Sequence, residues 1–181
     1  TISSASQKTA GTGTVDIAVS VDDADDNDTV RLKMEYKAGA DCSAGTSDPT
    51  FDETNASTTS TNGDPQVEND NEYQVGNSSG WITTSSGANT VNFDWLAETD
   101  VSTANGTYCI KVTPYDGLSV GTAATTTLTL DNVNPTSAGN VSLNTRTTSS
   151  ITLDFGVAGS DTNINNYKVY SFLLFLDPYL L

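Results

Sequence analysis

The chain has 181 residues, enough for one large or two small domains, and only 35% of them are hydrophobic. Seven Lys and Arg against 23 Asp and Glu give a net charge of −16, and there is no histidine. A surface this acidic disfavours nucleic acid and anionic lipid as partners, and the absence of histidine excludes His-based catalytic triads and His-ligated zinc.

Alternation of apolar and polar residues predicts the first strands. Residues 14–21 place Val15, Ile17, Val19 and Val21 on one face, and residues 30–36 do the same with Val30, Leu32, Met34 and Tyr36. An acidic turn at residues 22–28 separates these runs, which we expect to form neighbouring strands. Residues 2–8 fit a leading edge strand.

The middle of the chain is less regular. Residues 43–80 are rich in turn-forming residues and read as a long insertion with short strands at 72–75 and 81–83. Further strands are predicted at residues 90–95, 106–117 and 122–130. No window has a helical period, so the sequence predicts an all-β protein.

The end of this region resembles the closing half of immunoglobulin-like or fibronectin-type-III-like repeats of bacterial and archaeal surface proteins. The resemblance is carried by Gly106, Tyr108, Val112, Asp116, Gly117, Asp131, Asn132 and Pro135. Residues 149–155 and 166–170 resemble strands of a fibronectin-type-III-like repeat. The resemblance implies an antiparallel β-sandwich over residues 1–132, a linker at 133–136 and a partial second sandwich at 137–181.

On this sandwich interpretation, strand 30–36 runs antiparallel beside strand 107–115, which brings Cys42 close to Cys109. Because Tyr108, Ile110 and Val112 face inward, Cys109 faces outward, and we expect a surface disulfide in an oxidising compartment. The alternative is two free thiols. The chain also begins at Thr1 without a leader, which suits a mature secreted protein, and no stretch reaches the roughly 18 apolar residues of a membrane helix.

Calcium is the metal that this composition favours, because it binds carboxylate and carbonyl oxygens. One candidate site is the acidic turn, and the other is the junction between the two domains, which faintly resembles the calcium-binding linkers of cadherins. The alternatives are a solvated acidic turn and simple turn chemistry before Pro135. The candidate ligands are Asp22, Asp23, Asp25, Asp26 and Asp28 in the turn, and Asp131, Asn132 and Asn134 at the junction.

Two further surface features are open to more than one interpretation. Five Asn-X-Ser/Thr sequons are no more than chance predicts, and Asn55 and Asn77, in the insertion, are the preferred acceptors if the chain is glycosylated. Trp81, Trp95, Tyr73 and Tyr115 could form a sugar-stacking platform, although alternation with Phe93 places Trp95 in the core.

The C-terminal segment is almost entirely apolar, and residues 137–181 are too few for a complete sandwich of about 100 residues. In one explanation, copies of the chain exchange strands and form a head-to-tail homopolymer. In the other, the chain is a fragment of a longer array, or its end comes from an unrelated reading frame. The residues that would mediate assembly are Val169, Phe172, Leu173, Leu174, Phe175, Leu176, Leu180 and Leu181.

The sequence therefore predicts an extracellular structural subunit of a filament, pilus-like fibre or surface layer, and no enzyme. The alternatives are a spacer in a large adhesin or secreted enzyme, and a carbohydrate-binding module. No cofactor is required except, in the calcium hypothesis, that ion.

Overall fold

The computed structural model describes residues 1–23, 29–58, 66–76, 81–84, 89–134 and 141–155. Contacts divide the chain into two compact units, Thr1–Val133 and Asn134–Leu181, and each is described by itself. Nearly all regular structure is antiparallel β-sheet, so the predicted all-β class is confirmed.

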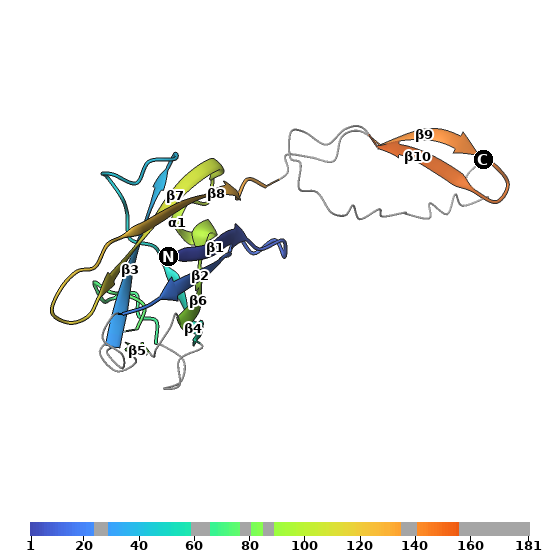
Figure 1. The fold of residues 1–181 in the computed structure, drawn as a ribbon. Coiled ribbons are helices and arrows are strands. Elements are labelled where there is room, and N and C mark those ends of the chain that lie inside the picture. Colours follow the sequence, from blue (N-terminus) through green and yellow to red (C-terminus); the bar gives the residue numbers. More distant parts are fainter. Residues whose placement is uncertain (24–28, 59–65, 77–80, 85–88, 135–140, 156–181) are drawn as a thin grey trace. The chain divides into compact units, whose positions relative to one another are not determined.

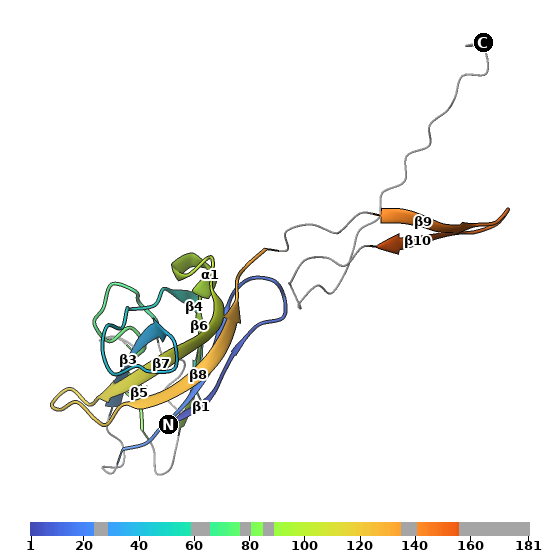
Figure 2. The ribbon, with the colours of Figure 1, turned by 90° about the horizontal axis from the view of Figure 1, so that it is seen from above.

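The first unit is a sandwich of two four-stranded sheets whose paired strands are all antiparallel (Figure 1). One sheet has the order β1-β2-β6-β4, and its strands are Ile2–Gln7, Val15–Val21, Asn89–Trp95 and Phe51–Thr58. The other has the order β5-β3-β7-β8, and its strands are Ile82–Thr83, Thr29–Ala38, Asn105–Tyr115 and Ala124–Asp131. Both views show β7 and β8 side by side (Figure 2).

This strand order matches the A-B-E-D and C-F-G sheets of an immunoglobulin-type sandwich, with β5 added beside β3. The order corrects one expectation. The runs that form β2 and β3 were predicted to be neighbours, but they lie in opposite sheets and face each other across the core. Alternation alone is the same in both cases, because it reports which side of a strand is buried and not which strand lies beside it.

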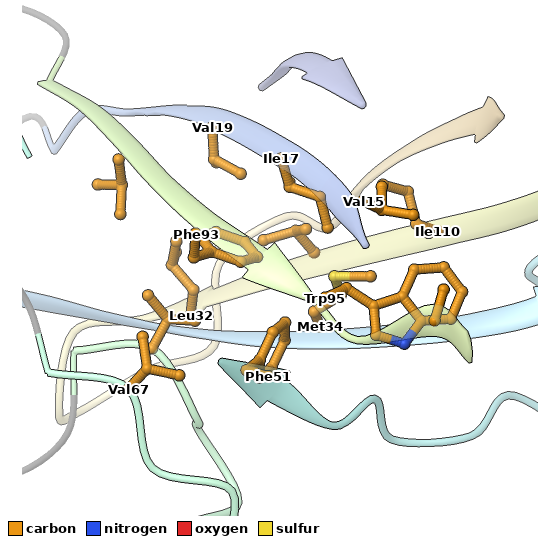
Figure 3. Packing of buried hydrophobic residues seen from close by; sticks show 14 of the residues in the cluster. Val15, Ile17, Val19, Leu32, Met34, Phe51, Val67, Phe93, Trp95 and Ile110 are labelled. Carbon is orange, nitrogen blue, oxygen red and sulfur yellow. The ribbon is translucent and has the colours of Figure 1, made fainter. Parts of the chain in front are cut away.

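The core lies between the inward faces of the two sheets. Val15, Ile17 and Val19 of β2 and Phe93 and Trp95 of β6 are each at most 3% exposed. Figure 3 shows these side chains converging with Leu32 and Met34 of β3 and Ile110 of β7. Aromatic contacts join the layers, since the Tyr36 and Trp95 ring centroids are 4.7 Å apart. Trp95 is therefore a core residue, as predicted.

Two elements differ from the sequence expectation. The predicted insertion at 43–80 contains an eight-residue edge strand, β4, that pairs with β6. A single helical turn, α1 (Ala97–Asp100), follows β6. A four-residue helix is too short to show a period, and β4 has a register shift between Phe51 and Ala56 that disrupts its alternation.

The described part of the second unit is a hairpin of β9 (Val141–Arg146) and β10 (Ile151–Phe155). Its strands are antiparallel, and Leu143 lies opposite Leu153. The strand β10 was expected from the resemblance at residues 149–155, whereas the expected strand at 166–170 lies outside the described residues. Among the described helices, none has the length and apolar character needed to cross a membrane.

Candidate functional sites

Cys42 and Cys109 form a disulfide, as predicted, but the bond is buried. The two residues are 6% and 2% exposed, so the expectation of a surface disulfide is wrong. Cys109 does lie on the outer face of β7, opposite Lys37 of β3. The segment after β3 turns back along the edge of that strand, where the backbones of Tyr36 and Ser47 exchange two hydrogen bonds of 2.9 Å. It also reaches the outer face, where the Thr46 hydroxyl donates to Glu35 and Cys42 bonds to Cys109. Alternation could not reveal this cover.

A charged cluster lies on the outer face of the first sheet. Lys8 Nζ is 2.5 Å from Asp94 Oδ2 and 3.0 Å from Asp16 Oδ1, and Asp16 and Asp94 are direct cross-strand partners. Asp94 is only 4% exposed and also accepts a hydrogen bond from the Asn55 side-chain amide. Burial raises the pKa of Asp94 although Lys8 opposes the change, whereas hydrogen bonding with Asp94 and Lys8 lowers the pKa of Asp16. Hydrogen bonds with Asp94 and Asp16 raise the pKa of Lys8.

This cluster changes the interpretation of one sequon. Asn55 was placed in an exposed insertion, but it lies in β4 and its amide nitrogen is engaged with Asp94. A glycan on that nitrogen would have to displace this contact. Asn77, the other preferred acceptor, lies outside the described residues.

The acidic turn can be placed only in part. Asp22 and Asp23 line a groove of about 510 Å³ together with Asp116, which was not among the predicted calcium ligands. Asp116 is already used as a turn residue, because its carboxylate accepts hydrogen bonds from the backbones of Leu118 and Ser119, and those bonds lower its pKa. The described carboxylates do not form a metal-binding group of three or more. Asp25, Asp26 and Asp28 lie outside the described residues, so calcium in this turn stays a prediction.

The junction residues hold the end of the first unit together. The Gln7 side chain donates to Asn132 Oδ1 at 2.6 Å and accepts from the Asp131 backbone at 2.8 Å. The Asn132 amide nitrogen donates to the Val101 carbonyl at 2.9 Å. Both polar atoms of the Asn132 side chain are thus engaged in structural hydrogen bonds. Calcium binding by Asp131, Asn132 and Asn134 stays a prediction.

Three of the four aromatic residues selected as a sugar-stacking platform do come together, and Trp95 does not. The Tyr73 and Tyr115 ring centroids are 4.8 Å apart at an interplanar angle of 23°. Arg31 joins them, with Cζ 5.5 Å from the Tyr115 ring and 3.8 Å from the Trp81 ring. All four side chains are half-buried. We call Tyr73, Tyr115, Arg31 and Trp81 the aromatic platform.

Arg31 was not among the residues predicted for the platform, although the expected strand pairing pointed to it. Strands 30–36 and 107–115 were predicted to pair, and in their register Arg31 lies directly opposite Tyr115. The platform also contacts the β7–β8 turn, since the Tyr115 hydroxyl donates to the Gly117 carbonyl at 2.8 Å. A Cβ on Gly117 would lie 3.0 Å from the Trp81 ring.

The hairpin of the second unit exposes apolar side chains. Val141, Leu143 and Ile151 are 53%, 60% and 65% exposed. The apolar segment from Val169 to Leu181, predicted to mediate assembly, lies outside the described residues. Comparisons of the chain with protein-family models, with curated proteins and with solved structures give no match.

Proposed function

We propose that the chain is an extracellular structural protein whose β-sandwich units associate with other copies of the chain. The observation that carries the proposal is the exposed apolar surface of β9 and β10, where Val141, Leu143 and Ile151 are each more than half exposed. A two-stranded hairpin is marginally stable alone, and its edges can accept another strand. Strand addition between copies would supply both hydrogen bonds and apolar cover.

An extracellular location is supported by the disulfide. Cys42, in the segment after β3, forms a disulfide with Cys109 of β7. Such bonds persist in oxidising compartments. The net charge of −16 keeps separate chains apart through repulsion. We therefore expect association to strengthen when salt screens this repulsion.

The test is sedimentation of the full chain over a range of protein and salt concentrations, with electron microscopy of the same samples. Leu143→Lys places a charge on the apolar surface, and Ser142→Lys is its matched control on the adjacent exposed position of β9. Each substitution adds one positive charge, so the general electrostatic change is equal. We expect only Leu143→Lys to reduce association. A wild-type chain that stays monomeric throughout would contradict the proposal.

A spacer within a longer surface protein is the second candidate. It is favoured by the closure of the first unit, where Gln7 of β1 bonds to Asp131 and Asn132 at the end of β8. A unit that satisfies its own ends can be repeated in series without specific contacts between chains. Deleting residues 171–181 separates the two functions, because assembly should fail under the first and solubility should not fall under the second.

A further inference from the structure

Within the part of the chain that the structure describes, no carboxylate forms an ion pair with the guanidinium group of the aromatic platform. Lys8, Lys33 and Lys111 each contact a carboxylate, but in the described ranges Arg31 forms no ion pair. Its Nε is buried and has no hydrogen-bond partner there. Buried polar atoms are nearly always hydrogen-bonded, so such an atom in a chain with 23 acidic residues needs an explanation.

Stacking explains part of the arrangement. The guanidinium lies 3.8 Å from the Trp81 ring centroid, a cation–π contact. This contact uses the face of the guanidinium plane. The N–H donors lie within that plane, so stacking does not use them. Since Nε is buried, an acceptor that arrives from solvent has to approach the two terminal nitrogens.

The surroundings favour an acidic acceptor. Arg31, Lys33 and Lys37 occupy alternate positions on β3, and Lys111 lies opposite Glu35 on β7. Four of the seven Lys and Arg residues therefore share the outer face of this strand pair. Lys33 and Lys111 are paired with Asp48 and Glu35, which leaves Arg31 as the cation beside the aromatic rings.

We propose that the aromatic platform binds a saccharide that carries a carboxylate, such as an oligosaccharide of uronic acids. The C–H face of a pyranose ring packs on the electron-rich face of an aromatic ring, and the half-buried rings of Trp81, Tyr115 and Tyr73 are the candidates beside Arg31. The carboxylate of the same sugar accepts two parallel hydrogen bonds from the terminal nitrogens of Arg31, since Nε is buried. Neither the aromatic rings nor the Arg31 guanidinium alone specifies this ligand. Together they match the apolar face of the sugar and its negative charge.

A structural role alone would also give stacked rings, because the platform joins the segment at Tyr73 and Trp81 to β3 and β7. That role does not need the in-plane donors of Arg31. The two roles therefore differ in what Arg31→Lys does. Lysine keeps the charge and a cation–π contact but has no planar fork.

The experiment titrates the full chain with oligosaccharides of galacturonic, glucuronic and mannuronic acid, and with their uncharged methyl esters. Tryptophan fluorescence and calorimetry follow binding. The chain has two tryptophans, and Trp95 is 0% exposed, so a spectral change on binding reports on Trp81. We expect at least one acid to bind roughly tenfold more tightly than its methyl ester.

Three variants complete the test, each with its melting curve as a check on folding. Arg31→Gln and Arg31→Lys should each lose most of the preference for the acid over its ester. Lys37→Gln removes a positive charge six residues along the same strand and should keep the preference for the acid over its ester. If Arg31→Gln does not fold, Arg31→Lys carries the comparison.

Several outcomes would overturn the proposal. They are binding of no acid in the series, equal binding of acid and ester, and equal losses in Lys37→Gln and Arg31→Lys. A change in sedimentation of ligand-free Arg31→Gln would instead assign the platform to a contact between copies. None of these results depends on whether β9 and β10 mediate assembly.

Discussion

At the residue scale, the most demanding position in the first unit is Asp94. Its carboxylate is buried at 4% exposure on the outer face of a sheet, where the alternation of β6 would place a solvated residue. It stays there because Lys8 and Asn55 contact it directly. The sequence did not predict this cluster, because Lys8, Asn55 and Asp94 come together only through the pairing of β1, β2, β6 and β4.

Replacing Lys8 should make the stability of the first unit depend on pH. In Lys8→Met the Asp94 carboxylate loses its cation, which should cost about 3 kcal/mol of unfolding free energy near neutral pH. Burial already raises the pKa of Asp94 above 3.8, and loss of Lys8 should raise it further. A raised folded pKa means that the cost shrinks as pH falls through that pKa and is absent below the unfolded value.

Urea unfolding of Lys8→Met at several pH values measures this effect. Lys33→Met is the matched control, because Lys33 is 3.7 Å from an Asp48 carboxylate that is 63% exposed. We expect that control to lose about 0.5 kcal/mol. Equal losses in the two variants would show that Asp94 does not depend on Lys8.

At the element scale, the sequence predicted strands best where one face is fully buried. The alternation of β2, β3, β6 and β7 follows the core, and these strands were all expected. The edge strand β4 was missed because its only apolar residues, Phe51 and Ala56, are five positions apart, which does not fit the alternation of a strand. The disulfide pairing followed from the expected pairing of β3 and β7, but its burial depends on a loop that no strand pattern describes.

The short helix α1 connects its neighbouring strands through one side chain. Asp100 accepts hydrogen bonds from Trp95 Nε1 at 2.7 Å and from the Thr50 backbone at 2.8 Å. Asp100→Ala leaves the buried indole without its partner, and we expect a loss of about 2 kcal/mol. Asp100→Asn keeps an acceptor and should lose less. Chemical unfolding measures both against Thr99→Ala, an exposed position of the same helix, which should change little.

The disulfide links Cys42, in the segment after β3, to Cys109 of β7 across 67 residues of sequence. Removing it in Cys42→Ser/Cys109→Ser should lower the unfolding free energy by about 4 kcal/mol, because the unfolded chain regains the entropy of that loop. Since both residues are nearly inaccessible, a reductant should also react slowly with the folded protein. Intact mass after thiol alkylation, with and without denaturant, checks the second point. Rapid alkylation of the native chain in the presence of the reductant would contradict the burial.

At the scale of the whole molecule, the sequence predicted the class of fold from its alternating strands, whereas the linker at 133–136 was implied by the resemblance to surface-protein repeats. It could not assign strands to sheets, because that depends on contacts between distant segments. The same limit applies to the sites. Three rings of the platform were among the four aromatic residues considered for sugar stacking, yet Arg31, on which the proposed preference for an acidic ligand depends, is placed beside them only by the register of β3 and β7.

The division of contacts at Val133 predicts that the first unit folds by itself. Among the described residues, every member of the buried hydrophobic core lies before this point. A chain of residues 1–133 should therefore unfold cooperatively, at the same temperature as the first unit within the full chain.

A chain of residues 1–130 lacks Asp131 and Asn132 and their bonds to Gln7 and Val101. It should be less stable by about 3 kcal/mol, since each of these three hydrogen bonds contributes about 1 kcal/mol. Calorimetry of the three chains tests this, and an unfolded 1–133 chain would show that the second unit supplies part of the core.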